Sequence, residues 1–91
     1  MDMLQRTREV LADLVAFPTI SSDSNLELIA YAANLLSEAG ATLSLTRDET
    51  GTKANLFATV GPEGDGGIVL SGHSDVVPVE GQDWSGDPFV L

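Results

Sequence analysis

The stretch Gly40-Ala41-Thr42-Leu43-Ser44-Leu45-Thr46 marks the point at which the chain changes from helical to extended patterning. Before it, apolar residues recur at the spacing of an amphipathic helix. After Gly40 they alternate with polar residues, as in a half-buried strand. Gly40 itself suits the left-handed position that often follows the last turn of a helix. The stretch therefore predicts a chain in which helices precede strands.

Two helices are predicted upstream of that stretch. Residues 2–16 carry apolar side chains at helical spacing and are followed by Pro18, which stops a helix. A second helix is predicted from about residue 24 to residue 39, because Ser24 followed by Glu27 has the spacing of a capping box. Each helix has an apolar face, so each is expected to pack against another layer.

About three strands are predicted downstream. Residues 41–46 and 54–60 form the first two, joined by the polar turn Asp48-Glu49-Thr50-Gly51. Residues 61–67 are rich in Gly and are predicted to form a further hairpin turn. Ile68-Val69-Leu70 is apolar on both faces, which is typical of a central strand in a sheet covered by helices. The pattern predicts an α/β layer fold and one domain at most.

The composition limits the classes of partner. The chain has 91 residues, and 4 Lys and Arg against 14 Asp and Glu give a formal net charge of −10. Such a chain repels phosphate backbones and anionic lipids, so neither nucleic acid nor a membrane is expected as a partner. At 43% hydrophobic it is too apolar for a disordered acidic tail. Because it has no Cys and no apolar run long enough to span a membrane, we expect a cytoplasmic protein.

The strongest chemical signal is the pair His73 and Asp75. His73 is the only His and lies just past the predicted apolar strand, where reacting groups gather in α/β folds. In an extended chain both side chains point to the same side. The carboxylate can then hold one imidazole nitrogen while the other nitrogen binds a metal. The alternative is a His that is simply held by local hydrogen bonds.

Other sites have less support. Glu80, Asp83 and Asp87 lie on a loop and are interpreted either as additional metal ligands or as a solvated acidic surface. With no second His to act as a base, a serine hydrolase is excluded. Residues 61–67 lack the Lys of a phosphate-binding loop. Trp84 is interpreted as an apolar plug whose N–H is satisfied.

The stretch from Ile68 to Pro78, followed by Trp84 and Asp87-Pro88-Phe89, resembles the first metal-ligand motif of the M20 metallopeptidases and deacylases. Further stretches are most similar to the acetylornithine deacetylase branch of that family, namely residues 17–21, 23–26, 53–56 and 79–84. The resemblance spans essentially the whole chain. It implies that residues 1–91 are the N-terminal portion of a longer metal-dependent catalytic domain, truncated here, with no second domain among them.

The resemblance also implies roles for the two site residues. His73 is expected to be a metal ligand, and Asp75 the carboxylate that is counted among the catalytic residues. Two zinc ions are expected per complete active site, with cobalt as a substitute. The other ligands, the general base and a dimerising lid domain are expected beyond Leu91.

The function implied by the resemblance is hydrolysis of a small N-acylated amino acid, N-acetylornithine to ornithine and acetate, in arginine biosynthesis. A succinyl-diaminopimelate desuccinylase, a carboxypeptidase-like relative and a non-enzymatic acidic binding module are the alternatives. The full-length enzyme is expected to be a homodimer. The 91-residue chain alone is expected to be inactive, and to associate with itself because a central strand would lack neighbours.

Overall fold

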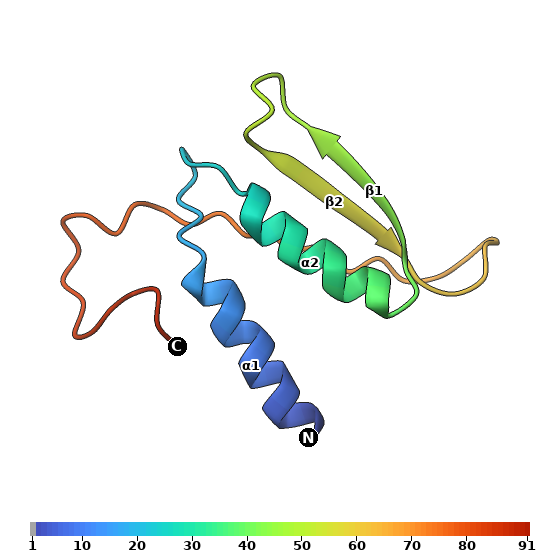
Figure 1. The fold of residues 1–91 in the computed structure, drawn as a ribbon, viewed down its shortest axis with the longest axis horizontal. Coiled ribbons are helices and arrows are strands. Elements are labelled where there is room, and N and C mark those ends of the chain that lie inside the picture. The colour runs from blue at the N-terminus through green and yellow to red at the C-terminus, as the bar shows by residue number, and fades with distance from the viewer. Residues whose placement is uncertain (1) are drawn as a thin grey trace.

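The computed structural model describes residues 2–91, in which two helices precede two strands (Figure 1). The elements are α1 (Met3–Ala16), α2 (Leu26–Glu38), β1 (Thr42–Arg47) and β2 (Ala54–Thr59). The predicted α/β class and the order of helices and strands are confirmed. Neither helix in this part of the chain is long and apolar enough to cross a membrane, and the cytoplasmic location stays a prediction.

The two helices begin differently from the sequence prediction. Asp2 caps α1, because its carboxylate accepts a hydrogen bond from the Gln5 N–H at 2.7 Å. The capping box predicted for α2 is wrong, since Asn25 occupies the N-cap position and Ser24 lies one residue before it. The Ser24 hydroxyl instead accepts from the Leu26 N–H at 3.2 Å. The side chain of Asn25 is engaged elsewhere, with β2.

The end of α2 follows the prediction closely. Gly40 has a φ of +87°, the left-handed conformation that glycine adopts without steric cost. Its N–H donates to the Ser37 carbonyl at 3.0 Å, and the Ala41 N–H donates to the Leu36 carbonyl at 3.0 Å. These two bonds form a Schellman motif, which satisfies the last carbonyls of the helix and turns the chain into β1.

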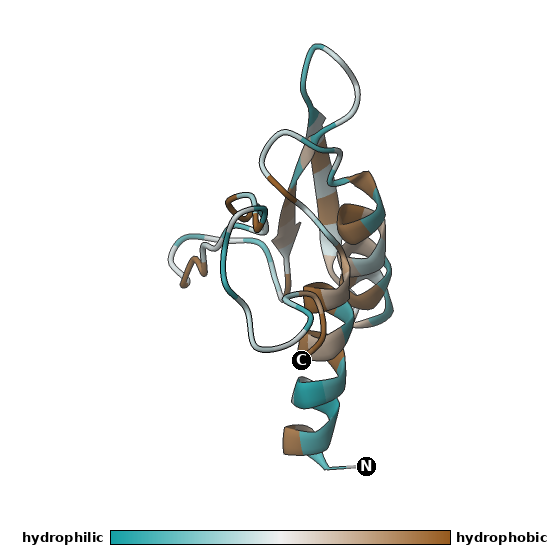
Figure 2. Cartoon of the chain, turned by 90° about the vertical axis from the view of Figure 1, so that its left-hand side faces the viewer, coloured by the Kyte–Doolittle hydropathy of each residue, from teal (hydrophilic) through white to brown (hydrophobic). Residues whose placement is uncertain are grey.

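The two strands form an antiparallel hairpin that packs on α2. Leu43 lies opposite Ala58 and Leu45 opposite Leu56, so their apolar side chains share one face of the sheet. α2 contacts both strands, and the helix and hairpin form adjacent layers when seen from the side (Figure 2). The small buried core lies between these layers and includes Leu28 of α2.

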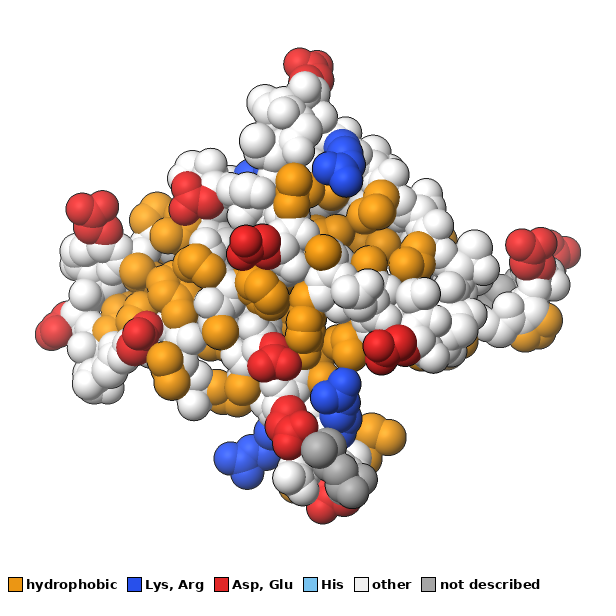
Figure 3. All heavy atoms as spheres, in the orientation of Figure 1, with side chains coloured by type: hydrophobic (Ala, Val, Ile, Leu, Met, Phe, Trp, Pro, Cys, Tyr) orange, Lys and Arg blue, Asp and Glu red, His pale blue; other side chains and the backbone are white. Residues whose placement is uncertain are grey.

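The third predicted strand is not formed in the described chain. Ile68, Val69 and Leu70 are 90%, 78% and 92% exposed and pair with no strand within residues 2–91. Because no strand follows residues 61–67, that Gly-rich segment is a loop, and the predicted hairpin turn is wrong. An apolar strand needs neighbours on its edges, and residues 68–70 have none here. Apolar side chains also reach the surface elsewhere in the C-terminal segment, residues 60–91 (Figure 3).

Candidate functional site

The segment around His73 is held against the connection between α1 and α2. The Val76 N–H donates to the Thr19 carbonyl at 3.0 Å, and the Ser21 N–H donates to the Val76 carbonyl at 3.0 Å, which forms a parallel β-bridge. The buried Thr19 adds a third bond, because its hydroxyl donates to the Ser74 carbonyl at 2.6 Å. Two segments more than fifty residues apart in the sequence are thereby fixed side by side.

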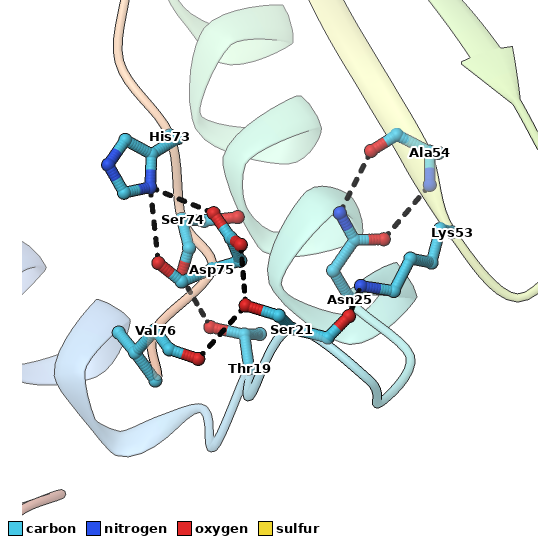
Figure 4. Close-up of polar contacts among 9 residues, drawn as sticks. All are labelled: Thr19, Ser21, Asn25, Lys53, Ala54, His73, Ser74, Asp75 and Val76. Carbon is cyan, nitrogen blue, oxygen red and sulfur yellow. Dashed lines mark hydrogen bonds and ion pairs between the residues drawn. The ribbon is translucent and has the colours of Figure 1, made fainter. Parts of the chain in front are cut away.

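His73 and Asp75 contact each other, as their spacing predicts. The His73 Nδ1 lies 2.8 Å from Asp75 Oδ1 and 3.1 Å from the Asp75 backbone carbonyl (Figure 4). Both neighbours are acceptors, so Nδ1 carries the proton when the imidazole is neutral. The other ring nitrogen, Nε2, points away from these contacts and keeps a free lone pair (Figure 4). The His73 side chain is 83% exposed and that of Asp75 is 49% exposed.

Asp75 has a second hydrogen-bond partner. Its Oδ2 accepts from the Ser21 hydroxyl at 2.7 Å. This bond is the largest cause of a lowered pKa for the Asp75 carboxyl, followed by the bond to His73, with a smaller contribution from the charge of Lys53. The lowered pKa means that the hydrogen bonds favour the ionised carboxylate, which is a good acceptor for the imidazole N–H.

The hairpin is anchored to the same connection. The Asn25 side-chain amide donates to the Ala54 carbonyl and accepts from the Ala54 N–H, both at 2.9 Å, as a paired strand would do (Figure 4). This anchor places Lys53 beside the connection, where its ammonium donates to the Ser21 carbonyl. Asn25 thus couples the start of β2 to the element that holds Asp75.

The site lies on an open groove of about 1240 Å³ between the helices, β2 and the C-terminal segment. His73, Asp75 and Lys53 line it together with the aromatic side chains of Trp84 and Phe89. The Trp84 N–H donates to the Gln82 side chain at 2.9 Å, which confirms the prediction that it is satisfied. The indole is 53% exposed, however, so its interpretation as an apolar plug is wrong.

The acidic loop does not complete a metal site. Within residues 2–91, no group of three or more His, Cys, Asp or Glu side chains could hold a metal ion. Glu80, Asp83 and Asp87 are therefore not gathered around His73, and the Asp87 carboxylate accepts from the Phe89 N–H at 2.9 Å. The described residues contain one imidazole, that of His73, with the Asp75 carboxylate as its hydrogen-bond partner, and its role as a metal ligand stays a prediction.

The residues that support the Asp75 segment, directly or through one another, were not predicted as site residues. Thr19, Ser21, Asn25 and Lys53 come from the loop before α2 and from the start of β2. The hydroxyl and amide side chains of the loop before α2 lie far from the His73 motif in the sequence, and no regular spacing links them to it. The available signal was that all four lie in stretches that resemble the same family as the His73 motif.

Comparison with curated proteins shows that this chain is similar to acetylornithine deacetylases. Those of Pasteurella multocida, Proteus mirabilis and Photorhabdus laumondii are 41%, 40% and 40% identical to it over 90 residues. Each match covers 91% of this chain and 23% of the relative, so the chain spans less than a quarter of the length of these relatives. No family model and no solved structure matches the chain. The resemblance predicted from the sequence is confirmed.

Proposed function

From the similarity to acetylornithine deacetylases over 91% of the chain, we propose that these residues are part of an amide hydrolase that deacylates a small N-acylated amino acid. The substrate that we propose is N-acetylornithine, which water cleaves to ornithine and acetate. The names of the relatives support this choice. The observation that carries the proposal is the hydrogen bond between His73 and Asp75, which leaves one imidazole nitrogen free in an open groove.

The residues fit a metal ligand. In neutral His73, two acceptors of Asp75 hold the proton on Nδ1. The Nε2 lone pair is then left to coordinate zinc, or cobalt in its place. A bound zinc ion supplies Lewis-acid polarisation of a substrate carbonyl. Because catalytic zinc takes three protein ligands, the remaining ligands come, in this proposal, from residues outside this chain.

Asp75 acts through His73 in this proposal. Its carboxylate holds the imidazole in one orientation and one tautomer, and its negative charge raises the basicity of Nε2. An aspartate is ionised at neutral pH, and the lowered pKa of Asp75 extends that charge to more acidic pH. The groove beside the pair, with Trp84 and Phe89 on its wall, is open enough to admit a small acylated amino acid.

An acetate-release assay tests the proposal. Two polypeptides are compared, the 91-residue chain and the product of the complete open reading frame that contains it. Each is stripped with a chelator and then supplied with zinc or cobalt, and each is offered N-acetylornithine or N-succinyl-diaminopimelate. We expect metal-dependent acetate release by the product of the complete reading frame and none by the 91-residue chain.

Three outcomes would contradict the proposal in different ways. Succinate release alone would favour a desuccinylase. No hydrolysis of either substrate by the zinc-loaded product of the complete reading frame would favour a non-enzymatic binding module. Metal-dependent hydrolysis by the 91-residue chain would show that no metal ligands from outside this chain are required.

A further inference from the structure

Ser21 stands out because its side chain reaches the candidate site from a distant part of the sequence. The hydroxyl lies 2.7 Å from Asp75 Oδ2 and 3.2 Å from the Val76 carbonyl. The carboxylate is the nearer and the charged acceptor, so it takes the main hydrogen bond. Ser21 does not contact His73 in this arrangement (Figure 4).

The backbone of Ser21 is fixed on both sides, so the position of its hydroxyl is well defined. Its N–H donates to the Val76 carbonyl at 3.0 Å, and its own carbonyl accepts from the Lys53 ammonium. The neighbouring Val76 N–H is bonded in turn to the Thr19 carbonyl at 3.0 Å. Three elements therefore hold the hydroxyl in place, namely the connection before α2, the start of β2 and the His73 segment.

The hydroxyl completes the restraint of the Asp75 carboxylate. Oδ1 is bonded to His73 Nδ1 and Oδ2 to Ser21, so both oxygens have separate partners and the carboxylate plane is fixed. Asp75 is half-exposed, so packing alone does not restrain its side chain. Without the Ser21 bond, the carboxylate can rotate into water, and His73 Nδ1 is left with the backbone carbonyl at 3.1 Å.

We propose that Ser21 is a positioning residue that aims the Asp75 carboxylate at His73 and thereby keeps the imidazole proton on Nδ1 and the Nε2 lone pair free. Its importance for hydrolysis rests on the proposed function. The arrangement of Ser21, Asp75 and His73 itself does not, and it can be tested without metal or substrate.

The single His makes the test direct. In the full 91-residue chain labelled with ¹⁵N, both imidazole nitrogens give signals that belong to His73 alone. Their shifts at about pH 9, where an imidazole is neutral, report the ratio of the Nδ1–H to the Nε2–H tautomer. We expect Ser21→Ala to lower this ratio roughly 2- to 10-fold, the equivalent of one ordinary hydrogen bond. Ser21→Thr keeps the hydroxyl and is expected to retain the wild-type ratio.

A matched control separates positioning from general support of the fold. Thr19→Val removes the hydroxyl that bonds to the Ser74 carbonyl in the same β-bridge, but it does not touch the Asp75 side chain. We expect Thr19→Val to lower stability without changing the tautomer ratio. If Ser21→Ala loses the amide signals of the hairpin, Ser21→Val, which has no donor and the branched shape of Ser21→Thr, replaces it in the comparison.

Two results would overturn the proposal. One is an unchanged tautomer ratio in a folded Ser21→Ala or Ser21→Val chain. The other is an equal change in Thr19→Val, which would make the effect a general consequence of weakening the bridge. If the tautomer ratio shifts as expected but no acetate is released, only the proposed function is contradicted. Failure of the Ser21 proposal and failure of the proposed function are therefore distinguishable.

Discussion

The β1–β2 hairpin and residues 60–91 both contain apolar runs, but in the described chain the ladder of paired strands lies in the hairpin. The hairpin joins its strands by a short polar turn, so each strand finds its partner nearby in the sequence. Within residues 2–91, the C-terminal segment forms one β-bridge to the loop before α2, between Ile20 and Val76, and the side chains of Thr19 and Ser21 add hydrogen bonds beside it. Local pairing therefore builds the scaffold, whereas the candidate ligand lies on a segment held by a few long-range hydrogen bonds.

The difference has an energetic reason. Closing a short turn costs little conformational entropy, while contacts between residues far apart must offset a larger closure cost before they contribute. Residues 68–70 meet no strand edge in the described chain and stay exposed despite their apolar side chains. Apolar character alone therefore does not place a segment in a sheet.

The largest expected effect on stability comes from Asn25→Ala, which breaks the attachment of the hairpin. Asn25 satisfies both the N–H and the carbonyl of the buried Ala54. Leaving both groups unpaired is expected to lower the free energy of unfolding by about 2–4 kcal/mol. Urea denaturation measures this change. The control is Asn55→Ala on the exposed neighbour in β2, expected within about 0.5 kcal/mol of wild type, and equal stability of the two variants would contradict the role of Asn25.

A pair of glycine substitutions compares the two regions directly. Gly51, in the hairpin turn, has a φ of +72°, so Gly51→Ala is expected to cost about 1–2 kcal/mol. Gly72 has no such backbone conformation and no atom within 4 Å of an added Cβ. Gly72→Ala is therefore expected to cause no loss of stability. Thermal denaturation checks both variants, and a larger loss at Gly72 than at Gly51 would show that Gly72 lies in a tightly packed environment.

Acidification is expected to weaken the hairpin turn. The Thr50 hydroxyl, followed by backbone N–H groups, lowers the pKa of Asp48. The stabilisation by Asp48 is therefore complete above the ordinary aspartate pKa of about 3.9, and is lost as the pH falls through the lowered pKa. Melting temperatures of wild type and Asp48→Ala should converge on going from neutral to low pH. A difference between them that is independent of pH would contradict this assignment.

Only a small effect on stability is expected at the apolar run of the C-terminal segment. Leu70 is 92% exposed, so Leu70→Ser should change the free energy of unfolding by no more than about 0.5 kcal/mol. It should, however, reduce self-association, because exposed apolar residues and an unpaired extended segment favour contact between copies. Sedimentation at micromolar concentrations measures this. A wild-type chain that is a clean monomer would contradict the expected self-association.

The sequence predicts the elements whose signals are local. The alternation after Gly40, the left-handed Gly40 itself and the polar turn at residues 48–51 each specify a conformation through neighbours in the chain, and all three are found. The strand predicted at residues 68–70 is not formed. Its apolar pattern is typical of a central strand with neighbours on both edges, and the described residues supply no such neighbours.

The candidate site divides in the same way. The contact of His73 with Asp75 follows from a spacing of two residues, and the structure contains it. The Ser21 hydroxyl reaches the same carboxylate only because a β-bridge joins two distant segments. No periodicity or spacing in the sequence encodes that bridge, so the supporting residues emerge only with the fold.

The central claim, that His73 is a metal ligand oriented by Asp75, is tested most directly by the zinc content of two variants of the product of the complete reading frame. His73→Ala removes the ligand and is expected to lose zinc together with hydrolysis. Asp75→Asn keeps an acceptor but loses the charge, so it is expected to retain zinc at saturation while kcat falls about 10- to 100-fold. Full zinc content in His73→Ala would contradict the claim, and equal zinc loss in both variants would make Asp75 a direct ligand.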